Sequence, residues 1–114
     1  MIIIHMEKVY NKLVRDNIPE IIIKDNRNPI YYQLSENDYW EALLQKDIEE
    51  LSEVREASSK DEIKKELADK LELIIAMAKY NGYTLQDIID EAEIKRNKNG
   101  SFNKRLYLEK VISK

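Results

Sequence analysis

Apolar residues recur at intervals of three and four along most of this chain, which is the spacing of one face of an α-helix. One stripe consists of Leu43, Leu44, Ile48, Leu51 and Val54, with Trp40 at its start. A second consists of Ile63, Leu67, Leu71, Ile74 and Ala78, and a shorter one of Ile88, Ile89 and Ala92. The pattern predicts an all-α chain. We expect Trp40 and the nearby tyrosines to belong to the core rather than to stack on a base.

Capping residues set the bounds of the predicted helices, which cover residues 17–24, 36–57, 60–81 and 85–97. Asn17 precedes Ile18-Pro19, where proline suits the first turn, and Ser35 and Thr84 are good caps for two later helices. The third helix ends at Gly82, a residue that readily adopts the left-handed conformation of a helix terminus. Residues 57–61 read as a helix end, a serine cap and a fresh acidic first turn. This turn predicts an antiparallel hairpin of the second and third helices.

One pair of segments departs from the helical pattern. Residues 30–34 are rich in β-branched and aromatic side chains, as expected for a short strand. If that strand forms, residues 105–109 are its expected partner.

Two pairs of acidic residues lie on the predicted hairpin. Glu50 and Glu53 form the first carboxylate pair, Glu66 and Asp69 form the second, and twelve residues separate the pairs. Side chains three residues apart lie on one side of a helix, so the hairpin lets the pairs face each other. Crowded carboxylates repel unless a cation lies between them, and oxygen-only ligands suit Mg²⁺, with Mn²⁺ as a substitute.

The alternative is that these acids form an ordinary solvated surface, since 36% of the chain is charged. A single E-x-x-E pattern is weak evidence for a site. On a helical wheel, however, Glu50 and Glu66 border the apolar stripes, whereas Glu49 and Glu56 point away. Both carboxylate pairs therefore flank the surface that packs, which favours a site. Two residues close to the second pair have open roles: Glu72 is either a surface acid, which is favoured, or a further ligand. Lys70 is expected to contact an acid or a phosphate.

The pattern EELSE, twelve residues, ELAD resembles the E-x-x-E(12 to 28)E-x-x-D signature of the MazG-like all-α nucleotide pyrophosphohydrolases, which include the phosphoribosyl-ATP pyrophosphohydrolases. Residues 10–22, YNKLVRDNIPEII, are similar to the opening of a small stand-alone branch of that superfamily. Residues 99–105, NGSFNKR, resemble its basic R-G-G-F-x-K segment but differ at Asn99 and Ser101. These matches extend over most of the chain. The resemblance implies a four-helix-bundle type of fold built by oligomerisation.

The resemblance and the distribution of charge together nominate the site residues. Residues 47–72 carry ten acids against five bases, whereas residues 94–114 carry seven bases against one acid. Metal ligands are expected at Glu50, Glu53, Glu66 and Asp69, and the proton acceptor at Glu50, Glu53 or the neighbouring Glu49. Substrate contacts are expected at Lys12, Arg15, Lys95, Lys104 and Arg105.

Length and composition restrict the class of protein. The 114 residues predict a single domain over 1–114, with residues 1–6 a disordered start or an extension, and Met6 an equally good start. A net charge of −3 argues against a general nucleic-acid binder. There is no cysteine, which fits a reducing cytoplasm, and the apolar start is too short for a signal or membrane segment. So small a core favours a homo-oligomer, a dimer or a tetramer.

The functional expectation is Mg²⁺-dependent hydrolysis of a nucleoside triphosphate to the monophosphate and pyrophosphate. Two glycines in the whole chain exclude a glycine-rich phosphate loop, and no nucleophile stands beside a base. One alternative is the same chemistry on phosphoribosyl-ATP. The other is a non-catalytic helical module that binds a nucleotide or dimerises without cleavage.

Overall fold

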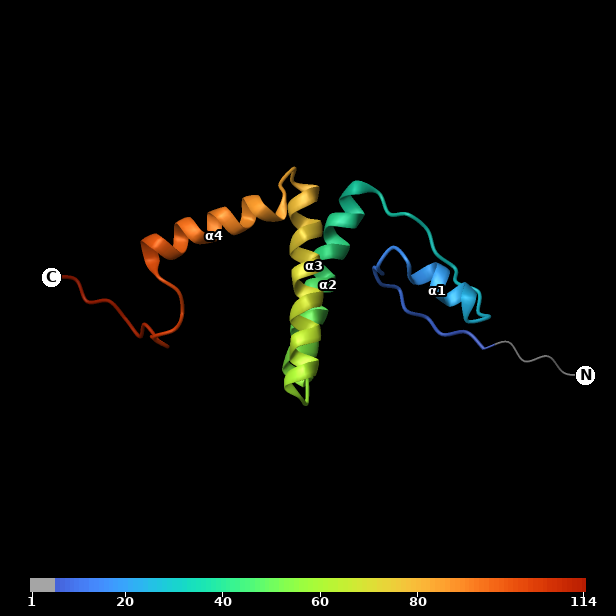
Figure 1. The fold of residues 1–114 in the computed structure, drawn as a ribbon, viewed down its shortest axis with the longest axis horizontal. Coiled ribbons are helices and arrows are strands. Elements are labelled where there is room, and N and C mark those ends of the chain that lie inside the picture. The colour runs from blue at the N-terminus through green and yellow to red at the C-terminus, as the bar shows by residue number, and fades with distance from the viewer. Residues whose placement is uncertain (1–5) are drawn as a thin grey trace, which may run out of the picture.

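Two helices of equal length form the centre of the molecule. In the computed structural model, which describes residues 6–114, α2 (Glu36–Glu56) and α3 (Lys60–Tyr80) lie side by side as an antiparallel hairpin (Figure 1). The short α1 (Ile18–Lys24) lies on one side of this hairpin, and α4 (Leu85–Asn99) leaves the end of α3 on the other side. The prediction of an all-α chain with four helices is confirmed for the described residues.

The helix starts follow the capping chemistry of the sequence. The hydroxyl of Ser35 accepts from the backbone N–H of Asp38, and Ser59 accepts from the backbone N–H of Glu62. Thr84 and Asp87 exchange hydrogen bonds with each other's backbone N–H groups, forming a capping box. Asn17 occupies the cap position of α1, but its side chain makes no capping hydrogen bond, so only its place was predicted.

The turn between the central helices is short and well satisfied. Besides the Ser59 cap, Glu62 reaches back to accept from the backbone N–H of Ser58. Gly82, with φ of 83°, ends the turn after α3 in the left-handed region as expected. Local hydrogen bonds therefore fix both the turn between α2 and α3 and the start of α3.

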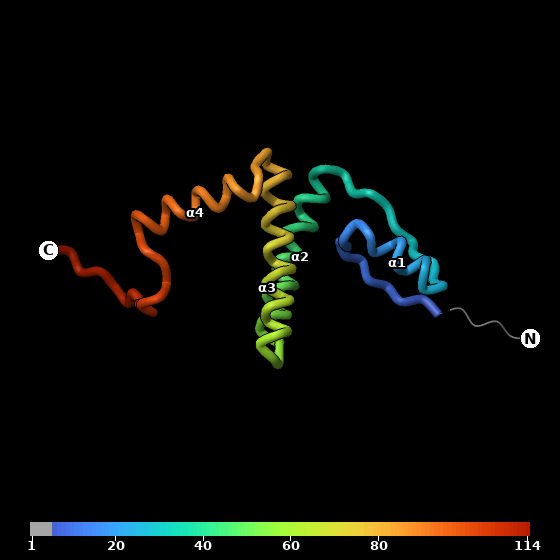
Figure 2. Tube along the Cα trace, in the orientation of Figure 1, coloured from blue at the N-terminus to red at the C-terminus, as the bar shows by residue number. Residues whose placement is uncertain are grey.

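The expected β-pair does not form within residues 6–114. Neither 30–34 nor 105–109 is a strand, and Ile30 and Tyr107 are 98% and 94% exposed. The tube in Figure 2 places these segments on opposite sides of the hairpin, one before α2 and one after α4. A strand needs a neighbour for its backbone groups, and neither segment has one in this chain. The first five residues, including His5, lie outside the described part of the chain.

The intrachain core is small and lies where α2 crosses α3. Leu43, Leu73 and Ala78 are its buried apolar residues. Leu73 was not in the predicted stripe of α3, and several residues of the predicted stripes remain substantially exposed: Ile48, Leu51, Leu67, Leu71 and Ile74. The predicted apolar stripe of α3 therefore includes Ala78, which is buried, but it does not identify Leu73, the other buried apolar residue of this helix.

The single chain is far more open than a compact domain of its size. Its radius of gyration is 19.9 Å, against about 13 Å for a compact chain of this length. It exposes 11367 Å², whereas a folded monomer of 13.5 kDa exposes about 6,500 Å². Helix α1 contacts no other helix of the described chain, and the segment after α4 is exposed throughout. No helix within residues 6–114 combines the length and apolar character needed to cross a bilayer.

Leu43 provides a direct test of this core, because it is 1% exposed and is the largest fully buried side chain. Leu43→Ala should lower the free energy of unfolding by about 2 to 5 kcal/mol, the usual cost of emptying a buried leucine site. Urea unfolding followed by circular dichroism measures the change. Gln45→Ala, at an exposed position two residues later, is the control, and an equal loss in both variants would contradict the assigned packing.

Candidate metal and phosphate site

Three carboxylates from the two central helices meet at one point. Glu50 and Glu53 project from α2 and Glu66 from α3, and one oxygen of each lies within 4.8 Å of the others. We call these three residues the carboxylate cluster. The hairpin brings them together because i and i+3 positions share a side of α2, and α3 runs back alongside it. The structure therefore assembles three of the four expected ligands.

Burial distinguishes this cluster from a solvated acidic surface. Glu50 is only 5% exposed, although it is a charged residue on a helix in an open molecule. With all three acids ionised, one oxygen of Glu50 and one of Glu66, Oε2 in each case, are buried without a hydrogen-bond partner. Buried polar atoms are normally satisfied, and an orphaned carboxylate oxygen is costly. This donor set fits a hard divalent cation such as Mg²⁺.

The crowding is visible in the protonation of the three acids. Burial raises the pKa of Glu50 from 4.5 to about 7, and hydrogen bonds with Glu66 and Glu53 and repulsion from nearby carboxylates act in the same direction. A hydrogen bond with Glu53 raises the pKa of Glu66, whereas the same bond lowers the pKa of Glu53. The cluster thus retains protons that separate carboxylates would have lost.

The fourth expected ligand, Asp69, is held by a cation instead. Arg15 donates to its Oδ1 at 2.6 Å, from the segment that precedes α1. Both side chains are more than one-third exposed, so the pair contributes little to stability. Its importance is its position, because it brings the N-terminal segment onto α3 one turn beyond Glu66. A guanidinium at that place is suited to phosphate oxygens, which it can contact with two donors.

Two lysines also contribute positive charge near the cluster. Both Lys46 and Lys12 help to lower the pKa of Glu53 through their charge. Lys12 also lies over the ring of Tyr10, at 5.4 Å from its centroid. Lys12 and Arg15, which the sequence predicts as substrate contacts, thus lie near the acids, and Lys46, which was not predicted, lies near them as well. The sequence pattern that could have identified Lys46, a basic residue three positions before Glu49 on the same helix, is too common in charged helices to indicate a site residue.

Other nominated residues lie elsewhere. Glu49 is outside the carboxylate cluster and faces Lys46 at 3.8 Å. Lys70 donates to Asp47 at 2.7 Å, a bridge between α3 and α2 that fulfils the expected contact with an acid. Glu72 lies on α3 beyond Asp69 and lines a separate pocket. The basic candidates Lys95, Lys104 and Arg105 lie on α4 and the segment after it, which Figure 1 shows extending away from the hairpin.

Comparison with known proteins gives little further guidance. The chain is 46% identical over 50 residues to an uncharacterized protein of Mycolicibacterium smegmatis, a match that covers 44% of this chain and 51% of that protein. The matched part therefore spans about half the length of this relative. No family model matches the chain, and no solved structure is significantly similar to it.

The raised pKa of Glu50 predicts a pH-dependent stability of the metal-free protein. Glu50 binds its proton more tightly in the folded chain than in the unfolded chain. The stability that this proton provides is therefore complete below about pH 4.5 and is lost as the pH rises through about 7. Glu50→Gln cannot ionise, so at pH 8 it should be more stable than the wild type by about 1 to 3 kcal/mol.

Thermal melting in EDTA between pH 5.5 and 8.5 measures this effect. The wild type should lose stability across the range, and Glu50→Gln should lose much less. Glu49→Gln, a half-exposed neighbour on the same helix, should keep the wild-type slope. Parallel curves for all three proteins would show that Glu50 is not the buried proton acceptor described here.

Proposed function

We propose that this protein is a Mg²⁺-dependent nucleotide pyrophosphohydrolase, which hydrolyses a nucleoside triphosphate to the monophosphate and pyrophosphate. The observation that carries the proposal is the carboxylate cluster, in which acids from both helices of the hairpin converge with two buried, unpartnered oxygens. An acid that only solubilises a surface has no reason to be buried, as Glu50 is, against two further carboxylates. The sequence resemblance to MazG-like pyrophosphohydrolases supports the same chemistry.

The acidic and basic residues of the site would have different roles in binding the cation and the phosphates. Glu50, Glu53 and Glu66 would hold the cation, with Asp69 joining them when Arg15 turns to the substrate. When bound, Mg²⁺ supplies charge neutralisation of the phosphates and a lowered pKa for the attacking water. Arg15, paired with Asp69, and Lys12, whose charge acts on Glu53, would contact the phosphates and oppose the repulsion between acids and phosphates.

In the proposed reaction, water attacks the α-phosphorus and the bond to the bridging oxygen of the departing pyrophosphate breaks. A carboxylate that is not fully engaged as a ligand accepts the proton of the water. Glu53 fits this role best, because it is the most exposed of the three and therefore the most accessible to a water molecule. Its lowered pKa keeps the carboxylate ionised at neutral pH, as a proton acceptor must be.

Substitution in the cluster should abolish turnover without unfolding the protein. Glu53→Gln and Glu66→Gln should each reduce pyrophosphate release by more than about 100-fold, since even residues that only orient metal ligands are worth about 10- to 100-fold. Glu56→Gln, on the last turn of α2, is the matched control and should retain activity. Near-normal turnover of both cluster variants at saturating Mg²⁺ would refute the site.

The substrate screen should include ordinary and modified nucleoside triphosphates and phosphoribosyl-ATP, side by side. Melting with and without Mg²⁺ completes the experiment, because a ligand that binds only the folded chain raises its melting temperature. A Mg²⁺-dependent rise without cleavage of any nucleotide would favour the non-catalytic binding module.

We further propose that the protein acts as a homo-oligomer in which exposed apolar stripes of neighbouring hairpins pack together as a four-helix bundle. The support is the surface excess of the single chain, nearly 5,000 Å² above a compact monomer, which is on the scale of obligate interfaces. The exposed stripe residues lie on both central helices, as such a bundle requires. The segment after α4, with Lys104 and Arg105, would then reach a neighbouring chain.

Mixing two inactive variants tests whether one site uses two chains. Glu66→Gln supplies a chain with a defective cluster, and the double variant Lys104→Ala, Arg105→Ala supplies one with a defective basic segment. Recovery of up to about one quarter to one half of wild-type activity on mixing is expected if a site combines residues of neighbouring chains. Light scattering should show a dimer or a tetramer. A fully active monomer would refute the assembly.

A further inference from the structure

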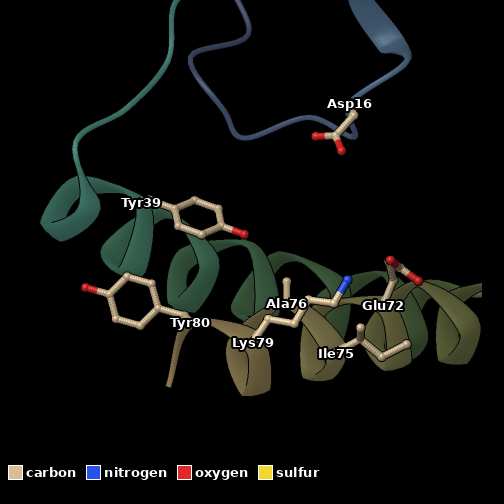
Figure 3. Close-up of a pocket in the computed structure, with 7 residues that line it drawn as sticks. All are labelled: Asp16, Tyr39, Glu72, Ile75, Ala76, Lys79 and Tyr80. Atoms are coloured by element: carbon tan, nitrogen blue, oxygen red, sulfur yellow. The ribbon is translucent and has the colours of Figure 1, made fainter. Parts of the chain in front are cut away.

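A pocket of about 420 Å³ lies further along the hairpin than the carboxylate cluster and is not used by the chemistry described above. Its walls come from three parts of the chain: the loop before α1, the first turns of α2 and the second half of α3 (Figure 3). Its lining residues are Asp16, Tyr39, Glu72, Ile75, Ala76, Lys79 and Tyr80, which we call the tyrosine pocket. The volume falls within the range of small-molecule sites.

The pocket lies further along the hairpin than the cluster and is turned around α3 from it. At 3.6 residues per turn, Tyr80 and Asp69 lie about 40° to 60° around the helix from Glu66, whereas Glu72 and Lys79 lie about 120° to 140° from it in the same direction. At 1.5 Å per residue, Lys79 lies about 15 Å from Asp69 along the helix. On α2, Tyr39 lies about 16 Å from Glu50 by the same measure. Since the helices are antiparallel, both distances lead to the same end of the hairpin, where the start of α2 meets the end of α3.

The two ends of the pocket differ in chemistry. Near the cluster it is polar, because Asp16 follows Arg15, which holds Asp69, and Glu72 lies one turn beyond Asp69. At the far end it is aromatic. Tyr39 and Tyr80 lie with ring centroids 6.0 Å apart, and Tyr80 stacks on Trp40 at 5.0 Å with an interplanar angle of 22°. The stack holds the Tyr80 ring in place before any ligand arrives.

The charges of the pocket exclude phosphate as its occupant. It contains two carboxylates and one ammonium group, from Asp16, Glu72 and Lys79. A phosphate there would meet a net negative wall, whereas hydroxyl groups would find acceptors in both carboxylates. Aromatic rings beyond them suit the flat face of a base, which stacks favourably on tyrosine. A neutral group with hydroxyls at one end and an aromatic ring at the other matches this lining.

From these observations we infer that the tyrosine pocket binds the nucleoside end of the substrate, with a ribose against Asp16 and Glu72 and the base against Tyr39 and Tyr80. This assignment rests on the proposed function for the location of the phosphates. It makes Arg15 and Asp16 adjacent contacts to phosphate and sugar, and it explains why the loop before α1 lies over the hairpin. It also predicts that ribonucleotides bind more tightly than 2′-deoxyribonucleotides.

Trp40 provides a direct reporter of binding, because it is the sole tryptophan and stacks on a wall of the pocket. Titration with the four ribonucleosides and their 5′-monophosphates, in EDTA, should give a saturable change in Trp40 fluorescence for at least one base. Tyr39→Ala should weaken that binding about 10- to 100-fold. Tyr32→Ala, at a position 82% exposed before α2, is the matched control and should leave it unchanged.

Hydrolysis separates this inference from the proposed function. Tyr39→Ala should raise the KM of a nucleoside triphosphate about 10- to 100-fold, yet leave hydrolysis of inorganic tripolyphosphate, which has no nucleoside, within about twofold of wild type. Asp16→Ala should remove the preference for ribose over 2′-deoxyribose while retaining binding of the base. Because Tyr39→Ala could disturb α2, Tyr39→Leu is measured beside it and should behave alike.

Each outcome has one meaning. Unchanged nucleoside binding and KM in both Tyr39 variants would overturn the pocket assignment while leaving the carboxylate site intact. Equal binding of ribonucleosides and 2′-deoxyribonucleosides by the wild type would overturn the placement of the sugar. Failure of the wild type to cleave any triphosphate would refute the proposed function, whereas a fluorescence titration that depends on Tyr39 would still establish the pocket.

Discussion

The burial of Glu50 between two helices is the constraint on which the rest of this structure depends. A carboxylate that is 5% exposed, beside two more carboxylates, is unfavourable unless it holds a proton or a cation. The chain accepts this cost within the α2–α3 hairpin, whose buried apolar residues, Leu43, Leu73 and Ala78, lie further along the same two helices. Such a local conflict in an otherwise consistent hairpin is typical of a functional site.

Two ion pairs position other parts of the chain near the buried Glu50 and its neighbouring carboxylates. Arg15 brings the N-terminal segment onto Asp69, and Lys70 ties α3 to α2 through Asp47 on the other side of the same hairpin. Neither ion pair is well shielded from water, so their main contribution is to position segments rather than to stabilise them. With cations beside the acids and the tyrosine pocket further along, the hairpin would offer the proposed nucleotide separate contacts for its phosphates and its nucleoside.

The single chain is open because its central hairpin cannot cover both of its own faces. A hairpin of two long helices has two broad faces, and one face is largely occupied by its own contact and the carboxylate cluster. The remaining stripe residues, such as Leu51, Leu67 and Leu71, are about half exposed. Helix α4 and the segment after it do not cover them, because they leave the hairpin at the end of α3 (Figure 1). Burial of these residues against another chain is the simplest physical remedy.

The sequence alone determined the helices and the candidate acids, because both depend on neighbours within a few residues. The spacing of apolar residues, the Ser35, Ser59 and Thr84 caps and Gly82 locate the helices to within a few residues. Only the tertiary structure decided which acids meet, because three-dimensional proximity depends on the register of α2 against α3. That register brings together Glu50, Glu53 and Glu66 and leaves Glu49 outside, while Asp69 pairs with Arg15.

The tertiary structure also decided the core and the pocket. Leu73 rather than Leu71 is buried against α2, and three segments form the tyrosine pocket, for which no local pattern exists. The expected strand at 30–34 does not form, because its expected partner, residues 105–109, lies on the other side of the hairpin. The composition of two segments does not determine how far apart they lie in the fold.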